Sequence, residues 1–172
     1  MDGGGALMNQ GIHGIDMLTY LVGPVKSVYG NTKTLLHNIE VEDTANAIVE
    51  YKNGAVGMIQ GTTSVSPGYP RRLEICGTKG SVVIEEDRII KWDVDGLTLP
   101  DELKCVESDV KGASDPTAFP TKYHELQIAD MIDAIINNKD PLVNLYEGRK
   151  AVEIILAIYE SSKKDKKVIL DL

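Results

Sequence analysis

The chain has 172 residues, of which 42% are hydrophobic and 26% charged, with a formal net charge of −8 and a pI of about 4.9. This composition is typical of one folded globular domain and excludes a disordered chain. The acidic balance argues against a nucleic-acid or anionic-membrane partner, because both require clustered Lys and Arg. The basic residues 163–167 are interrupted by Asp165, so they are predicted to form a solvated helix end.

No targeting or membrane segment is predicted. The sequence has no run of about 18 apolar residues, and its N-terminus lacks the pattern of a signal peptide. Cys76 and Cys105 are far apart and show no CxxC spacing, which indicates neither a disulfide framework nor a zinc site. A reducing, cytoplasmic location is therefore expected.

The first two thirds of the chain predict one helix followed by strands. The helix covers residues 7–22 and ends at Gly23-Pro24. From residue 25 to about residue 90, short runs of β-branched and apolar residues alternate with turn residues, which predicts an antiparallel meander. The turns are expected at Asn53-Gly54, at residues 77–80 and at Glu86-Asp87. Asn-Gly is a strong hairpin signal because both residue types tolerate a positive φ.

The last third predicts a loop and two helices. Residues 95–120 are rich in turn-forming residues, so a long loop with one further short strand is expected there. Apolar spacing predicts helices over residues 121–138 and 146–163, and "KVILDL" predicts a closing strand. This order indicates an α+β fold, in which residues 1–172 form a single domain. We expect an open, mostly antiparallel mixed β-sheet with helices packed on one face.

A narrow stripe of polar residues runs along the predicted first helix. Asn9, His13, Asp16 and Tyr20 are spaced by 4, 3 and 4 residues, which places them within about 60° of one another on an α-helix. The remaining surface is apolar, so the helix is expected to be buried or almost buried. Each polar group is then expected to have a partner, because an unpaired buried polar group costs a few kcal/mol.

Three interpretations of the stripe remain open. Asp16 would orient the His13 ring, and Asn9 would bond a neighbouring loop, in a purely structural network. Alternatively, the stripe lines a pocket in which His13 donates or accepts a proton near neutral pH. A metal site on His13 and Asp16, as in a small metal-dependent hydrolase, has less support because no second His or Cys lies at ligand spacing.

The glycines at positions 3–5 do not form a dinucleotide-binding fingerprint. That fingerprint requires a preceding strand and an acidic residue about 20 positions further on, at the end of a second strand. Only Met1-Asp2 precede the glycines, and no βαβ pattern follows them. No cofactor-binding residue is therefore predicted in this chain.

Three ordered blocks of the sequence resemble the C-terminal domain of the Gfo/Idh/MocA (glucose–fructose oxidoreductase / inositol dehydrogenase) family. "GGGALMNQGIHGIDMLTYLVGPVKSVYG" resembles the segment that opens this domain, and "GYPRRLEICGTKGSVVIE" resembles a later sheet segment. "YHELQIADMIDAIINNKDPLVNLYEGRKAVEIILAIYESSK" resembles the closing helices. The resemblance covers nearly the whole chain.

This resemblance implies the substrate-binding and oligomerisation domain of an NAD(P)-dependent dehydrogenase that acts on a sugar, a cyclitol or a nucleotide sugar. NAD or NADP and a catalytic lysine would belong to an N-terminal Rossmann domain that is absent here. The chain alone would then be inactive, Met1 would be an artificial or misannotated start, and the open sheet face would form a homodimer or homotetramer. The competing function is a non-catalytic dimerising or regulatory module that retains the fold.

The resemblance also assigns roles to residues of the first helix. His13 matches the catalytic histidine, which helps to move the proton of the hydroxyl being oxidised. Asn9 stands where many members have Asp; its amide can orient His13 or bind a hydroxyl but cannot act as a base. "NQGIH", which includes Gln10, resembles members that oxidise nucleotide-linked amino sugars at the 3-position, such as UDP-N-acetylglucosaminuronate dehydrogenases.

Four residues are expected to bind substrate: Gln10, Asp16, Tyr69 and Tyr123. Tyr69, in "PGYPRR", matches a substrate-loop position of inositol dehydrogenases, although a turn residue packed on the sheet rim has the same pattern. Tyr123 opens the penultimate helix, where a solvated first turn is the alternative. Arg71 and Arg72 are interpreted as surface ion-pair partners rather than as anion ligands.

Overall fold

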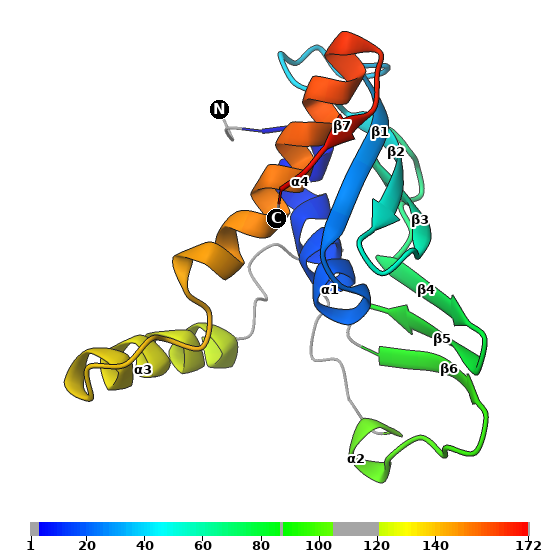
Figure 1. The fold of residues 1–172 in the computed structure, drawn as a ribbon. Coiled ribbons are helices and arrows are strands. Elements are labelled where there is room, and N and C mark those ends of the chain that lie inside the picture. The colour runs from blue at the N-terminus through cyan, green and yellow to red at the C-terminus, as the bar shows by residue number, and fades with distance from the viewer. Residues whose placement is uncertain (1–3, 87, 105–120, 172) are drawn as a thin grey trace. The chain divides into compact units, whose positions relative to one another are not determined.

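The computed structural model describes residues 4–86, 88–104 and 121–171 (Figure 1). The chain divides into two compact units, each of which has its own secondary structure. The first unit comprises Met1–Gly68 and Leu145–Leu172, and the second comprises Tyr69–Asn144.

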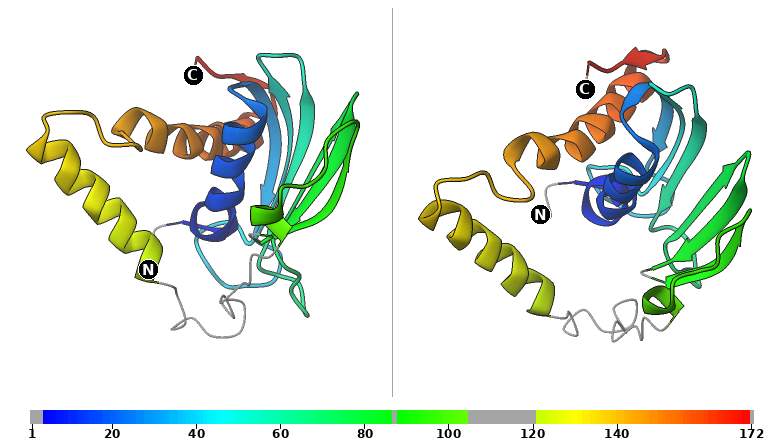
Figure 2. Two further views of the ribbon diagram at one scale, coloured as in Figure 1. Left: turned by 90° about the horizontal axis from the view of Figure 1, so that it is seen from below. Right: turned by 60° about the horizontal axis from the view of Figure 1, so that its bottom comes forward.

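The first unit is an antiparallel sheet with helices on one face (Figure 2). Its strands lie in the order β3-β2-β1-β7. Their bounds are β1 Val25–Lys33, β2 Thr44–Tyr51, β3 Val56–Thr62 and β7 Val168–Ile169. The helices are η1 Leu7–Gly11, a π-helix that continues into α1 Ile12–Val22, and α4 Leu145–Lys164.

The core of the first unit lies between the sheet and these helices. Buried residues alternate along β2, where Ala45, Ala47, Val49 and Tyr51 form one face, because successive side chains of a strand point to opposite faces. The buried isoleucines of α4 face the same core at helical spacing. A Cβ at Gly30 would lie 2.7 Å from Ile158 Cγ2, so α4 packs directly against the backbone of β1.

The predicted hairpin at Asn53-Gly54 is confirmed, and it joins β2 to β3. Only Gly54 has a positive φ, of 90°, and its N–H donates to the Tyr51 carbonyl at 3.0 Å. The connection is therefore a three-residue loop with glycine in its last position, rather than the two-residue loop that Asn-Gly favours. Asn53 Oδ1 accepts a hydrogen bond from the Ala55 N–H at 3.0 Å, and Asn53 Nδ2 donates to the Val22 carbonyl at 2.8 Å.

The second unit contains a three-stranded antiparallel sheet in the order β4-β5-β6. Its elements are β4 Arg72–Gly77, β5 Gly80–Glu85, β6 Arg88–Val94, α2 Asp101–Lys104 and α3 Thr121–Ile136. Both predicted turns of this sheet are confirmed. Gly80 has a φ of 148° at the first turn, and Glu86 has a φ of 49° at the second, while residue 87 lies outside the described residues.

The predicted α+β class with open antiparallel strands and helices is confirmed, with one difference. The strands form two separate sheets, and every strand pair in the described ranges is antiparallel, so no mixed sheet forms there. In residues 95–104 the structure has the short helix α2 and no strand, whereas residues 105–120, including Cys105, lie outside the described residues, so the further strand predicted in 95–120 stays a prediction for that part. Both C-terminal helices and the closing strand β7 are confirmed. Among the described residues, no helix has the length and apolar character needed to cross a membrane.

A buried carboxylate holds the loop between β1 and β2. Asp43 is 0% exposed, and its oxygens accept backbone N–H groups from Leu35 at 2.8 Å, Leu36 at 2.8 Å and His37 at 3.0 Å. Burial raises the pKa of this carboxyl. The three backbone donors and the Ser64 hydroxyl outweigh that effect, so the net pKa lies well below its usual range.

Asp43→Asn is expected to destabilise the protein at neutral pH. Because the folded-state pKa is depressed, ionised Asp43 contributes stability above the unfolded-state pKa of about 3.9 and loses it as pH falls. The difference in Tm between wild type and variant, measured by thermal unfolding, should shrink between about pH 5 and pH 2. Glu40→Gln makes the same chemical change at an exposed position of the same loop and should leave Tm nearly unchanged. A Tm difference that is independent of pH would contradict this account.

Candidate functional site

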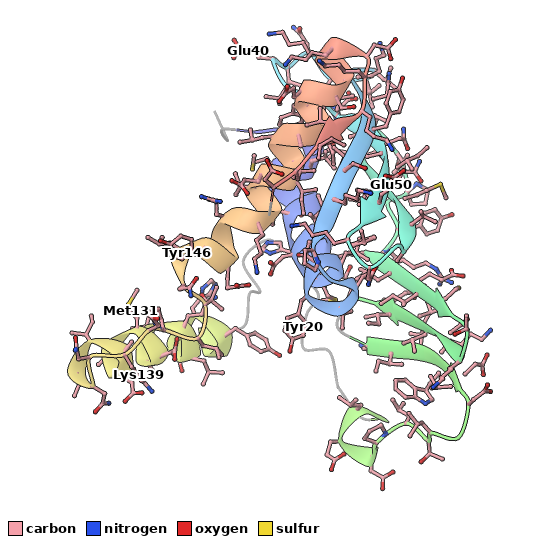
Figure 3. All side chains as sticks on the ribbon, in the orientation of Figure 1. Tyr20, Glu40, Glu50, Met131, Lys139 and Tyr146 are labelled. Carbon is pink, nitrogen blue, oxygen red and sulfur yellow. The ribbon has the colours of Figure 1, made fainter. Side chains whose placement is uncertain are left out.

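Four of the predicted site residues lie on one exposed face of the first helix. Asn9 and Gln10 are carried by η1, and His13 and Asp16 by α1; all four side chains are exposed. Tyr20, which Figure 3 labels near the C-terminal end of α1, continues this face and is 87% exposed. The structure therefore brings these residues together as one accessible polar face.

The predicted burial of this helix is wrong for the described chain. Leu7 and Ile15 are 1% and 2% exposed and belong to the core, so one side of the helix is packed. The opposite side carries the polar residues and leaves Leu21 46% exposed. The helix is apolar nearly all round, as predicted, but this chain supplies packing partners for only one side of it.

The first turn of the helix is a π-helix, whereas an α-helix was predicted throughout residues 7–22. Gly11 lies at the end of this turn, where an added Cβ would come within 3.3 Å of Leu7 Cδ2 and 3.4 Å of the Ala6 carbonyl oxygen. Short π-helical turns occur frequently at functional sites. This turn carries Asn9 and Gln10, so the 100° spacing used to predict the stripe does not hold at its start.

The purely structural network, one of the three interpretations of the stripe, is not formed in the part of the chain that the structure describes. There, the side chains of Asn9, His13 and Asp16 make no hydrogen bond or ion pair with one another or with another residue. Thr19 Oγ1 instead donates to the Asp16 carbonyl at 2.7 Å. No group of three or more His, Cys, Asp or Glu side chains among the described residues is arranged to hold a metal ion.

Two residues that the sequence did not single out hold the start of this helix. Glu42 is 8% exposed, and its Oε1 accepts hydrogen bonds from the Leu7 N–H at 2.9 Å and from the Tyr159 hydroxyl at 3.0 Å. Burial and the adjacent Glu42 carboxylate raise the pKa of Tyr159, so its phenol remains a donor. The acidic "EVED" stretch gave no indication that one carboxylate faces the helix and the next faces the loop.

The remaining candidates belong to the second unit. Tyr69 lies three residues before β4 and is 87% exposed, and Tyr123 lies on α3 and is 61% exposed. Arg72 forms ion pairs with Glu85 at 2.8 Å and Glu74 at 3.4 Å, which confirms its interpretation as a surface ion-pair residue. The two tyrosines are thus accessible, as a substrate-binding role requires.

A model of the C-terminal alpha/beta domain of an oxidoreductase family, Gfo/Idh/MocA, matches residues 2–170. The chain belongs to the Gfo/Idh/MocA family. Solved structures of WlbA dehydrogenases are similar to this family member in fold and sequence. Those from Chromobacterium violaceum and Bordetella pertussis, both in complex with NADH and UDP-GlcNAcA, have TM-scores of 0.80 and 0.79 and identities of 34% and 31%. Each match covers 98% of this chain, and 47% and 49% of those chains.

A curated relative gives a second point of comparison. The scyllo-inositol 2-dehydrogenase (NAD(+)) of Bacillus subtilis is 27% identical over 98% of this chain and 48% of its own length. This Gfo/Idh/MocA chain therefore spans about half the length of the relatives that it matches along its whole length.

Proposed function

We propose that this chain is the substrate-binding and oligomerisation domain of an NAD(P)-dependent oxidoreductase that oxidises a hydroxyl of a sugar, cyclitol or nucleotide sugar. The observation that carries the proposal is the exposed face of η1 and α1, where His13 stands without a side-chain partner among the described residues. Family membership supports the reaction class. A cytoplasmic location and an N-terminal Rossmann domain are parts of the same proposal.

In the proposed reaction His13 moves the hydroxyl proton. A neutral imidazole nitrogen accepts the proton as the carbon–hydrogen bond breaks, and the exposed ring can release it to water. Asn9 offers an amide to orient the imidazole or to hold a hydroxyl, but it cannot take a proton. Gln10 and Asp16, on the same face, would bind further hydroxyls. Tyr69 and Tyr123 are the substrate-binding residues that we propose for the second unit, in which both are exposed.

The cofactor would be held by residues outside this chain. The start of η1 hydrogen bonds to Glu42, which also accepts from Tyr159, rather than forming a phosphate-binding loop. Among its described residues, neither unit has the parallel βαβ arrangement of a dinucleotide site. When bound, NAD or NADP supplies the hydride acceptor for the oxidation. In the reaction itself, this chain would bind the substrate and move its proton.

A nucleotide sugar is the substrate class that the comparisons favour. The WlbA structures, which hold UDP-GlcNAcA, are 31% and 34% identical to this chain, whereas the scyllo-inositol dehydrogenase is 27% identical. The exposed amides of Asn9 and Gln10 suit hydroxyl or acetamido groups, because each offers a donor and an acceptor.

The test is cofactor reduction by the complete protein. NADH or NADPH formation should be measured with UDP-GlcNAcA, myo-inositol and scyllo-inositol, each with NAD+ and with NADP+. We expect the highest kcat/KM with UDP-GlcNAcA. Faster oxidation of an inositol would overturn the nucleotide-sugar assignment, and no cofactor reduction with any sugar or cyclitol would favour the non-catalytic module.

The oligomerisation part of the proposal rests on the sheet face opposite α1 and α4. Tyr29, Ile48 and Met58 are neighbours across β1, β2 and β3, and they are 42%, 56% and 84% exposed. An apolar row of this kind on one sheet face is typical of a subunit contact. We propose that two copies of the protein meet through this face in a homodimer or homotetramer.

A further inference from the structure

The start of the helix that carries His13 is held by contacts from two distant parts of the chain. The Ala6 N–H donates to the Glu42 backbone carbonyl at 3.0 Å, and the Leu7 N–H donates to Glu42 Oε1 at 2.9 Å. The Tyr159 hydroxyl on α4 donates to the same Oε1 at 3.0 Å. The first N–H groups of a helix have no partner within the helix, and this cluster supplies partners for them.

The fit around Glu42 leaves the helix little freedom to shift. Glu42 is 8% exposed, and a Cβ at Gly5 would overlap both its carboxylate and its backbone carbonyl. Leu7 is 1% exposed, and its Cδ2 would lie 3.0 Å from a Cβ at Gly61 on β3. The carboxylate also carries negative charge close to the positive end of the helix dipole, which is a favourable arrangement.

The geometry points to Glu42 as a positioning residue that, together with Tyr159, fixes the π-helical turn and thereby the place of Asn9 and His13 on the substrate face. Glu42 itself does not face the substrate side, because its carboxylate is turned toward the Leu7 N–H and the Tyr159 hydroxyl. The neighbouring Asp43 is also buried, at 0% exposed, but it holds residues 35–37 of the β1–β2 loop, which carry none of the candidate site residues. This pair therefore offers a matched comparison of two adjacent carboxylates.

The inference rests on the proposed function, in which His13 moves the proton. A reacting group displaced by about 1 Å can lose about 100-fold in rate. We expect Glu42→Ala in the complete protein to lower kcat by about tenfold per folded molecule, with KM changed less than threefold. Glu42→Gln keeps an oxygen that can accept the Leu7 N–H, so it should recover much of this loss. Asp43→Asn should lower Tm but leave kcat per folded molecule within about twofold.

A double-mutant cycle separates positioning from a general loss of structure. If Glu42 acts through His13, Glu42→Ala should change kcat less than twofold in a His13→Ala background. An equal loss of kcat in both backgrounds would overturn the inference, and so would a loss that matches the fraction of unfolded protein. Should Glu42→Ala fail to fold, Glu42→Gln and Tyr159→Phe are each measured in the wild-type and His13→Ala backgrounds instead. If each lowers kcat by the same factor in both backgrounds, the inference is overturned.

A measurement without substrate distinguishes failure of this inference from failure of the proposed function. Hydrogen exchange of the backbone amides of residues 9–13 should be at least tenfold faster in Glu42→Gln or Tyr159→Phe than in wild type. Asp43→Asn should instead speed exchange at residues 35–37 and leave residues 9–13 within about twofold. If exchange at residues 9–13 is unchanged in both Glu42→Gln and Tyr159→Phe, Glu42 does not hold the turn, whatever reaction the protein catalyses.

Discussion

His13→Ala in the complete protein is expected to lower kcat by at least about 100-fold, because loss of a general acid–base group costs about 100- to 10,000-fold. The KM for the sugar should change much less, because the imidazole acts mainly on the proton transferred in the reaction. Steady-state cofactor reduction over a range of sugar concentrations gives both quantities. Added imidazole should restore part of the kcat of the variant, because the face that carries residue 13 is open to solvent in the chain.

The control for this prediction is His37→Ala. His37 lies on the β1–β2 loop, where its Nδ1 is 3.3 Å from Asp43 Oδ2, so the substitution removes an imidazole without touching the helix. It should leave kcat within about twofold. Turnover of His13→Ala close to that of wild type would leave His13 as a surface residue and would remove the main support for the proposed mechanism.

The elements of the fold follow from local patterns in the sequence. β2 alternates buried and exposed residues from Thr44 to Tyr51, and α4 repeats its isoleucines at helical spacing, so both were predictable from periodicity. The hairpin after β2 was predictable from Asn53-Gly54. The division of the strands into two sheets was not, because it depends on which strand edges hydrogen bond and not on the pattern of any one strand.

The candidate site was predictable only in part. The polar spacing of Asn9, His13 and Asp16 identified one face of the helix, but periodicity carries no information on what covers that face. The Leu7 N–H at the start of the π-helical turn donates to Glu42, which lies 35 residues away in the sequence. Such long-range contacts are invisible to a local pattern.

Met58→Glu is expected to break the subunit contact that we propose for the open sheet face. Met58 is 84% exposed and pairs with Ile48 on β2, which in turn pairs with Tyr29 on β1. Glu50, which Figure 3 labels on β2, already places a carboxylate on this face, held by Ser27 Oγ at 2.8 Å and Lys167 Nζ at 2.8 Å. A second carboxylate, in the apolar row, would lose its water on association, which disfavours the contact. In a two-fold contact each copy brings one such carboxylate, so this cost occurs twice.

We expect the dimer Kd to rise by at least about 100-fold, which corresponds to about 2.7 kcal/mol and is the scale of an interface hot spot. Sedimentation velocity across a concentration series measures this change directly. Met58→Leu keeps the row apolar and should preserve association, whereas Leu35→Glu adds a carboxylate at a residue that is 68% exposed on the β1–β2 loop and should not weaken it. A wild-type protein that sediments as a monomer at micromolar concentration would contradict the proposed contact. Equal association by wild type and Met58→Glu would place the interface on another face, because an unpaired carboxylate buried between two apolar rows has no compensating partner.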